Sequence, residues 1–307
     1  MVEPPETRIA PKPVYESDQV HVPTNSTLPD DPGSDCAEIV IRARSGWIAI
    51  NWEEMIAQRE LLAFLIWRDI SIRYKQTILG SAWAVLQPLL MMLIFTFVFG
   101  RFVGKNNPDI SVPYPVFIFA GLIPWTLFSQ GYAQAALSLA THQHLLSKVY
   151  FPRLFIPIAA ASVFLVDLAY SLGIYAVILL YYRITPSWTI VFLPLLIGLT
   201  LIATLSLGIM LSALTVFYRD VRHVVPFLTQ ILMFVTPVIY PLSALEKYHS
   251  LLALNPMFGI VTAYRAAIFG GDWHWPVVAI STTSAIVSFL FALFYFRRTE
   301  RRFADFV

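Results

Sequence analysis

The chain has 307 residues, of which 57% are apolar and only 13% are charged, and its formal net charge is +2. Soluble domains usually carry about 25% charged residues, so the composition excludes a soluble globule, a disordered chain and a nucleic-acid-binding protein. With a single cysteine, Cys36, it also excludes a disulfide-rich secreted domain. We therefore expect a protein that lies in a lipid bilayer.

The first 38 residues differ in charge from everything that follows. They contain eight acidic and two basic residues, for a net charge of −6, together with seven prolines, which leaves +8 for the remaining chain. Such a segment buries too little apolar surface to offset the entropy lost on ordering, and no apolar signal-peptide core follows Met1. The sequence therefore predicts a disordered, acidic and proline-rich cytoplasmic tail at residues 1–45 and a transmembrane domain at residues 46–307.

An amphipathic helix is predicted at residues 51–67, where the transmembrane domain begins. Asn51 is suited to cap this helix, with Glu54 as its reciprocal partner three residues later. Apolar residues recur on one face, as is typical of a helix that lies in the membrane interface; they are Trp52, Met55, Ile56, Leu62, Ile66 and Ile70. A charged strip then precedes the first span and consists of Arg68, Asp69, Arg73 and Lys75.

Six segments are long and apolar enough to cross the hydrocarbon core, which takes roughly 20 residues per helix. They are residues 81–100, 115–137, 154–182, 188–217, 224–241 and 276–296. The fifth is short and contains Pro226 and Pro237, which predicts a distorted or broken helix. The sequence thus predicts an all-α integral membrane protein with six transmembrane helices and an N-terminal amphipathic interface helix.

The segment between the fifth and sixth spans, residues 242–275, is too apolar for a simple loop. Asn255-Pro256 breaks it in the middle and Gly270-Gly271 ends it. We expect re-entrant periplasmic helices here, because backbone can turn inside a bilayer only where protein or water surrounds it. A plain pair of amphipathic external helices is the alternative.

The distribution of lysine and arginine sets the expected orientation of the spans. With the N-terminus inside, twelve of these residues lie on the cytoplasmic side of the span ends and five lie outside. The five outer residues are Arg101, Lys105, Arg183, Lys247 and Arg265. Both termini of this multi-pass protein are therefore predicted to be cytoplasmic.

Residues that could carry catalysis, or bind a metal or a nucleotide, are scarce in this chain. His142 and His144 have no carboxylate nearby, so no metal site is predicted. No serine, histidine and acid can be grouped for nucleophilic catalysis, and the glycine spacing at Gly100–Lys105 is too short for a phosphate-binding loop. We expect a transport subunit that is not an enzyme and has no catalytic residue, cofactor or nucleotide site of its own.

Asp167 is the one carboxylate placed within a predicted span, and such residues are functional candidates by default. An ion-coupled carrier would use Asp167 as a proton relay. The sequence suggests no lysine, arginine or histidine partner for it within the membrane, so we favour a hydrogen bond to a neighbouring helix. The energy source for transport is then expected to lie outside this chain.

Three stretches together resemble the membrane subunit of a type-2 ABC exporter, in the branch that exports O-antigen, capsule and teichoic acid polymers. They are Glu60–Gly100, which runs through the interface helix into the first span, then Leu214–Tyr240, and finally the Leu254-Asn255-Pro256 break with the basic C-terminal segment that contains Phe303-Ala304-Asp305. The resemblance covers about residues 52–307, which is nearly everything but the tail.

The resemblance implies a homodimer in the bacterial inner membrane, joined by two cytoplasmic ABC ATPase subunits that bind ATP and magnesium. It also implies that the loop between the second and third spans forms a coupling helix that docks on the ATPase, with the interface helix contributing to the same contact. The residues of this coupling segment are His142, Gln143, His144, Leu145, Leu146, Ser147, Lys148, Val149 and Tyr150.

The expected cargo is a lipid-linked polysaccharide, and two groups of residues are candidates for contacting it. Its pyrophosphate end would be attracted to the cytoplasmic surface, where the candidates are Arg68, Arg73, Lys75, Arg219, Asp220 and Arg222. Aromatic faces suit weak contact with a moving glycan, and the candidates for lining its channel are Phe95, Phe99, Phe117, Phe119, Trp125, Phe227, Phe234 and Tyr240. Alternatives are a permease of the same family for a small hydrophobic drug, an ion-coupled carrier that uses Asp167, and a membrane-embedded transferase.

Overall fold

The computed structural model describes residues 52–75, 82–104, 110–142, 151–300 and 303. The chain divides into two units, Met1–Gly46 and Trp47–Val307, and all described residues belong to the second. The predicted tail, residues 1–45, lies outside the described residues. Within the described ranges the backbone forms helices and connecting turns, without a β-strand, which confirms the all-α prediction.

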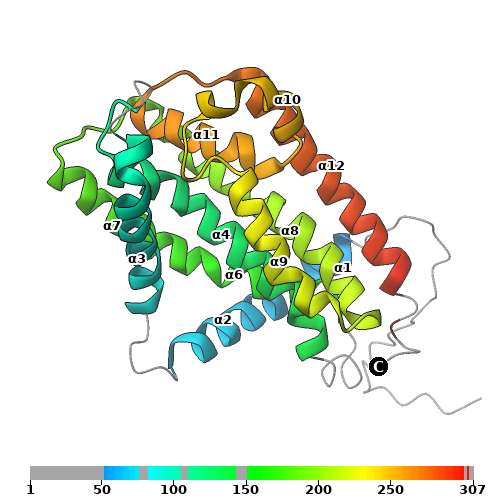
Figure 1. The fold of residues 1–307 in the computed structure, drawn as a ribbon. Coiled ribbons are helices and arrows are strands. Elements are labelled where there is room, and N and C mark those ends of the chain that lie inside the picture. The colour runs from blue at the N-terminus through cyan, green and yellow to red at the C-terminus, as the bar shows by residue number, and fades with distance from the viewer. Residues whose placement is uncertain (1–51, 76–81, 105–109, 143–150, 301–302, 304–307) are drawn as a thin grey trace, which may run out of the picture. The chain divides into compact units, whose positions relative to one another are not determined.

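The described helices are labelled in Figure 1 as far as there is room. The α-helices are α1 Trp52–Ala57, α2 Arg59–Lys75, α3 Ala82–Phe99, α4 Tyr114–Thr141, α6 Phe155–Ser162, α7 Phe164–Tyr181, α8 Leu193–Phe217, α9 Val221–Val235, α10 His249–Leu252, α11 Pro256–Phe269 and α12 Trp275–Glu300. A π-helical turn, η1 Gly100–Gly104, and two 3-10 segments, η2 Trp188–Phe192 and η3 Leu242–Tyr248, complete the order.

Five segments of the described chain are long and apolar enough to cross a membrane. They are Ala82–Val103, Tyr114–Thr141, Phe155–Tyr181, Trp188–Phe217 and Trp275–Glu300. Their lengths exceed the roughly 20 residues that a spanning helix needs. The prediction of a multi-pass membrane protein is therefore confirmed.

The predicted fifth span, residues 224–241, takes a different form in the structure. The 15 residues of α9 make a helix about 22 Å long, which is shorter than the roughly 30 Å hydrocarbon core. Pro226 lies within this helix, whereas the helix ends before Pro237, whose ring and missing N–H oppose its continuation. The six-span count thus stays a prediction, with α9 as its broken member.

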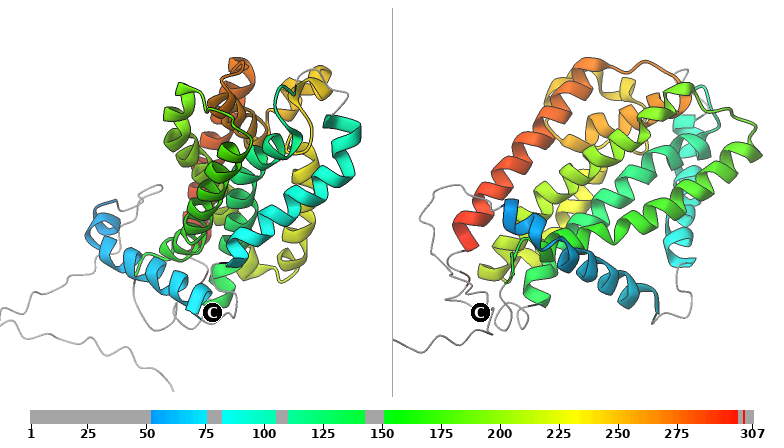
Figure 2. Two further views of the ribbon diagram at one scale, coloured as in Figure 1. Left: turned by 90° about the vertical axis from the view of Figure 1, so that its left-hand side faces the viewer. Right: turned by 180° about the vertical axis from the view of Figure 1, so that it is seen from behind.

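Helices α10 and α11 lie at one end of the bundle, and α2 lies at the opposite end (Figures 1 and 2). The side chain of Asn255 caps α11 by accepting a hydrogen bond from the backbone N–H of Met257 at 3.1 Å. Gly270 ends the helix in the left-handed region, with φ 75°. The predicted break and stop therefore mark the two ends of α11, while its re-entrant depth stays a prediction.

Helix α4 forms the centre of the bundle, and most of its side chains are buried. It packs along α8 and also contacts α6, α7 and α11. Helix α3, in contrast, is almost entirely unburied although it is strongly apolar, with Leu93 58% exposed and Phe97 88% exposed. An apolar helix with so little burial must meet lipid or another protein chain on its outer face.

Close packing of α4 on α8 depends on two glycines. A Cβ atom at Gly208 would lie 2.7 Å from the Cβ of Ala135, and one at Gly131 would lie 2.7 Å from Cγ2 of Thr204. Small residues of this kind let membrane helices approach closely.

We expect Gly208→Leu to force α4 and α8 apart and to lower the free energy of unfolding by about 1–3 kcal/mol, as overpacking of a tight contact does. The measurement is the midpoint of thermal unfolding of the purified protein in detergent. Gly198→Leu is the matched control, because it lies on the same helix and a Cβ there meets no atom within 4 Å. Equal midpoints for the two variants would contradict the packing argument.

The single helix predicted at residues 51–67 is wrong in two respects, because a turn at Gln58 divides it into α1 and α2, and α2 continues to Lys75. On the predicted apolar face, Leu62 and Ile66 pack with the buried Leu65 in a cluster to which α6 contributes. Phe64 and Trp67 are instead exposed, at 62% and 66%. This face of α2 therefore packs against the bundle, and its position in the membrane interface stays a prediction.

Candidate functional site

Asp167 lies near the start of α7 and is contacted by two side chains from the last turn of α2. Nη2 of Arg73 donates a hydrogen bond to Oδ2 of Asp167 at 2.9 Å, and the hydroxyl of Tyr74 donates to Oδ1. The Arg73 guanidinium also lies over the ring of Phe164, 4.4 Å from its centroid. The prediction of a hydrogen bond to a neighbouring helix is confirmed. The sequence suggested no cationic partner for Asp167 within the membrane, and the partner that it has, Arg73, comes from α2, which extends past its predicted end and reaches α7.

The charges of this cluster compensate each other in a half-buried setting. The side chain of Asp167 is only 16% exposed and that of Arg73 is 36% exposed. Burial, together with the hydrogen bond to Asp167, raises the pKa of the Tyr74 phenol well above its usual range, so Tyr74 remains a donor at neutral pH. An ion-paired and hydrogen-bonded carboxylate is suited to join α2 to α7, and poorly suited to relay protons.

A small cavity adjoins Asp167 between α3, α4 and α7. Its polar lining consists of Gln87, Thr126, Gln130, Asp167 and Ser171, and its apolar lining of Ala84, Pro88, Leu127 and Phe164. Its free space holds about one water molecule, so neither a sugar nor a phosphate fits within it. These side chains therefore form a polar patch beside the end of α2 that is large enough for a single water molecule.

A second contact joins α2 to the end of α4, where the predicted coupling segment begins. Arg68 donates to Oδ1 of Asp69 from Nε at 2.9 Å and from Nη2 at 2.8 Å, and its Nη2 also lies 3.3 Å from Nε2 of His142. Nδ1 of His142 lies 2.9 Å from the carbonyl oxygen of Ser138. A neutral imidazole that donates from Nδ1 and accepts at Nε2 satisfies both contacts. The rest of the predicted coupling segment, residues 143–150, lies outside the described residues.

The predicted cargo-access residues fall into two groups in the structure. Arg68 and Arg73 have the protein partners described above. The exposed group comprises Lys75 at the end of α2, and Arg219, Asp220 and Arg222 where α8 turns into α9. Both segments lie at the end of the bundle where α2 lies (Figure 1). The structure thus leaves the second group open to a ligand, while the charges of the first group are already used within the protein.

The eight aromatic residues predicted to line a channel do not share one surface of this chain. Phe117, Phe119 and Trp125 are buried in the packing of the central helix α4. The ring of Phe119 stacks on that of Tyr175, with centroids 5.6 Å apart. Burial follows from the central place of α4, which the apolar pattern of one helix cannot reveal.

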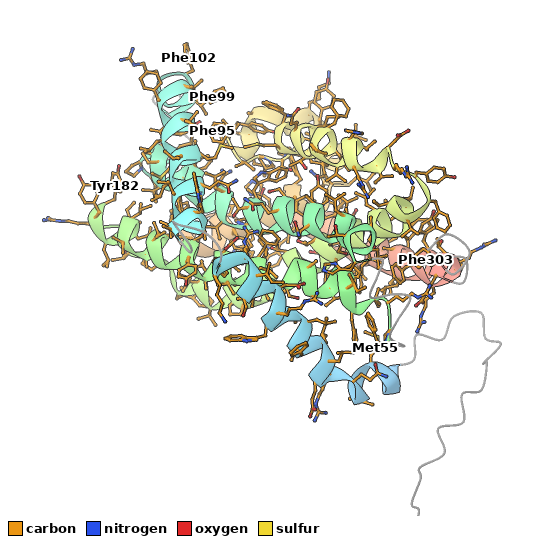
Figure 3. The ribbon with its side chains drawn as sticks, turned by 90° about the horizontal axis from the view of Figure 1, so that it is seen from below. Met55, Phe95, Phe99, Phe102, Tyr182 and Phe303 are labelled. Carbon is orange, nitrogen blue, oxygen red and sulfur yellow. The ribbon has the colours of Figure 1, made fainter. Side chains whose placement is uncertain are left out.

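The remaining five aromatic residues lie at or near the surface of the chain. Phe95 and Phe99 are half-buried on α3, with ring centroids 6.2 Å apart, and precede the exposed Phe102 (Figure 3). The others are Phe227 and Phe234 on α9, which are 63% and 68% exposed, and the half-buried Tyr240 that follows. These residues of α3 and α9 are the ones that a neighbouring molecule can reach.

Arg265 is a functional candidate that the sequence alone did not indicate. It was counted with the five outer residues, in a segment where helices were expected, and the structure places it inside α11, where it is only 9% exposed and contacts the segment after α9. Its burial and its carbonyl partners were not predicted. The available signal was a single cation within the apolar run of residues 256–269, a placement that membrane proteins tolerate only with specific partners.

Comparison with known proteins identifies the family of the chain. A relative from Myxococcus xanthus, the O-antigen export system permease protein RfbA, is 34% identical over 219 residues, which cover 70% of this chain and 83% of the relative. A protein of the same name from Klebsiella pneumoniae is 27% identical over 248 residues, covering 80% of this chain and 94% of the relative. The polysialic acid transport protein KpsM of Escherichia coli is 31% identical over 224 residues, covering 70% and 83%.

Residues 60–269 match the family described as ABC-2 type transporter. The match begins in α2 and ends with α11, so it spans more than half of the chain and includes the Asp167 cluster, the polar cavity and Arg265. Members of this family are the transmembrane subunits of ABC transporters, in which a separate subunit hydrolyses ATP. The chain therefore belongs to the ABC-2 type transporter family, as a membrane permease subunit that is not itself an enzyme.

Proposed function

We propose that this chain is the transmembrane subunit of an ATP-driven ABC exporter that moves a lipid-linked polysaccharide of the O-antigen type across the bacterial inner membrane. The observation that carries this proposal is the family match over residues 60–269, together with relatives named for O-antigen export and polysialic acid transport. In this proposal, transport runs from the cytoplasmic to the periplasmic side. Both chain termini lie in the cytoplasm, an orientation that the distribution of lysine and arginine predicts.

ATP and magnesium bind to two separate cytoplasmic ATPase subunits in this proposal. The ATPase docks on the coupling segment, residues 142–150, and its conformational change is transmitted to the end of α4. Because Arg68 contacts His142 and Arg73 contacts Asp167, α2 is joined to both α4 and α7. A displacement of the coupling segment would therefore move α2 and the first turn of α7 together.

Two copies of the chain form the exporter in this proposal. Support comes from the exposed apolar side chains of α3 and α9, among which are Leu93, Phe97, Phe227 and Phe234. A second copy that covers part of these faces would enclose a path lined by the aromatic residues of both helices. Phe117, Phe119 and Trp125 would reach such a path only if the packing of α4 changed.

The exposed basic residues are the proposed contacts for the phosphate-linked end of the cargo. Lys75 lies at the end of α2, and Arg219 and Arg222 lie at the same end of the bundle. Anionic head groups are attracted to such surface cations.

Loss of this chain should remove a polysaccharide from the cell surface, and restoring the chain should return it. In liposomes, the chain assembled with its ATPase should move a lipid-linked glycan only when hydrolysable ATP is present. The matched control is the same assembly with a non-hydrolysable ATP analogue. Transport of the glycan by the isolated chain, with neither nucleotide nor companion subunit, would contradict the proposal.

Asp167→Asn separates the exporter from an ion-coupled carrier. The variant keeps the shape of the side chain and its capacity to accept from Tyr74, but it removes the charge that a proton relay needs. We expect transport to remain dependent on ATP and insensitive to an imposed proton gradient. Because the variant also removes the ion pair with Arg73, a lower rate alone does not identify a carrier. A carrier would instead respond to the gradient, and not to ATP, in the parent chain.

A further inference from the structure

Arg265 lies in the middle of α11 among side chains that are almost all buried, from Met257 to Ile268. The ion pairs of the described residues do not include it. A buried guanidinium without a carboxylate partner carries a desolvation cost that only several good hydrogen bonds can offset. The contacts of Arg265 therefore indicate what keeps it there.

The guanidinium of Arg265 donates to the main-chain carbonyls of two other segments. Nη1 donates to Pro237 O at 2.6 Å and to Tyr240 O at 3.3 Å, and Nη2 donates to Val238 O at 2.7 Å. Nε donates to Phe117 O at 3.4 Å, and the guanidinium carbon lies 3.7 Å from the centroid of the Phe117 ring. One side chain of α11 thus contacts both α4 and the turn after α9.

The turn after α9 is residues 236–240, and its carbonyls lack the partners that a continuing helix would supply. Arg265 does not contact the other two carbonyls of the turn: Ile239 O accepts a hydrogen bond from the hydroxyl of Tyr114 at 2.9 Å, and Thr236 O accepts from the backbone N–H of Val238 at 2.7 Å. The hydroxyl of Thr236 accepts from Nδ2 of Asn255, the N-cap of α11, at 2.9 Å. Side chains of α4 and α11 therefore supply hydrogen bonds to the polar groups of the turn. These bonds stabilise the turn, because an unpaired carbonyl in an apolar setting costs free energy.

The shape of this contact requires arginine and leaves little space beside it. A planar guanidinium directs its five donors into different parts of one plane, whereas a lysine ammonium is a point charge with three donors. On the facing side, a Cβ atom at Gly121 would lie 2.7 Å from Nη2 of Arg265. Glycine at this position of α4 thus makes room for the guanidinium.

We propose that Arg265 is a positioning residue that fixes the turn at residues 236–240 and thereby orients the aromatic side chains of Tyr240 and Phe234. The hydroxyl of Tyr240 donates to Phe234 O at 2.8 Å, so the turn and the last part of α9 are connected. This inference rests on the proposed function, in which Tyr240 and Phe234 line the glycan path. Arg265 acts through these residues and does not itself touch the cargo.

The first test replaces Arg265 in the full exporter with its ATPase. Arg265→Met should lower the export rate by about tenfold or more, because several charge-assisted hydrogen bonds are lost, while ATPase binding and ATP hydrolysis persist. The export rate of Arg265→Lys should lie between the rates of the parent chain and of Arg265→Met. Arg183→Met, which removes an exposed arginine, is the matched control and should export normally. Unchanged export in Arg265→Met would overturn the inference.

A second readout reports the position of the turn directly. In a Cys36→Ser background, thiol labelling of Tyr240→Cys should become faster by about tenfold when Arg265→Met is added, because the turn loses its hydrogen bonds. An unchanged labelling rate would overturn the inference. This readout needs no cargo. If the proposed function is wrong, no variant will carry polysaccharide, yet labelling at position 240 will still depend on Arg265.

Gly121→Ala tests the same contact even if Arg265→Met does not fold. The added methyl should displace the guanidinium and reduce export in the parent chain. In Arg265→Lys the Nη2 atom is absent, so adding Gly121→Ala should reduce export much less. Equal effects of Gly121→Ala in the two backgrounds would show that the glycine and the arginine act independently, and would overturn the inference.

Discussion

Arg73→Glu should abolish export and lower the free energy of unfolding by about 2–3 kcal/mol. The variant would place a second carboxylate beside Asp167, where Nη2 of Arg73 now lies 2.9 Å from Oδ2. Breaking a fully buried ion pair costs about 3–5 kcal/mol. We expect less here because the Arg73 side chain is 36% exposed, so solvent screens part of the repulsion. The measurements are the midpoint of thermal unfolding and the amount of surface polysaccharide.

Lys75→Glu is the matched control for Arg73→Glu, because it makes the same change of charge two residues further along α2 at an exposed position. We expect its unfolding midpoint to remain unchanged, while export falls if Lys75 contacts the anionic end of the cargo. The exchange of both charges, Arg73→Asp with Asp167→Arg, should restore part of the stability. An unfolding midpoint of Arg73→Glu equal to that of Lys75→Glu would contradict the role of the pair in joining α2 to α7.

Leu93→Arg should prevent stable insertion or assembly of the chain. Leu93 lies near the middle of α3 and is 58% exposed on a helix that has almost no burial. An arginine near the centre of a spanning helix costs about 2.5–3.5 kcal/mol in insertion measurements. If the outer face of α3 meets lipid or a second copy of the chain, this cost applies in full. The measurement is the amount of folded protein recovered from the membrane.

Trp83→Arg is the control for Leu93→Arg on the same helix. Trp83 is similarly exposed, at 52%, but lies in the first turn of α3, where a long cation reaches the polar interface. We expect normal insertion of this variant. Normal insertion of both variants would indicate that the middle of α3 faces water, and would place Leu93 beside an aqueous path.

Composition and hydropathy were sufficient to predict the class of the protein and most of its long helices. The apolar runs at residues 81–100, 115–137, 188–217 and 276–296 each contain a helix in the structure, because backbone hydrogen bonds in an apolar setting are satisfied within one helix. The break near Pro237 and the ends of α11 at Asn255 and Gly270 were also predictable. Proline and glycine act on the local backbone, so their effect can be read without knowing what lies nearby.

The candidate site was harder to predict because its residues come from distant parts of the chain. Arg73 and Asp167 are 94 residues apart in sequence, and nothing in the pattern of either segment indicates that α2 reaches α7. For the same reason, Arg73 was predicted to contact the cargo, whereas the structure pairs its charge with Asp167. The partners of Arg265 were not predictable, because they are main-chain carbonyls of other segments, and a count of cations does not reveal them.

The sequence by itself determined that this protein lies in a membrane, which segments are helical, and to which family it belongs. Those properties depend on apolar content, local backbone preferences and matched stretches of residues. Only the tertiary structure decided that α4 is the buried centre, that the apolar face of α3 is left uncovered, and that Arg73 and Arg265 are bound within the protein. These properties depend on which helices pack together. A charge or an aromatic ring that faces lipid differs in energy and in role from one that contacts a carboxylate, a carbonyl or another packed ring.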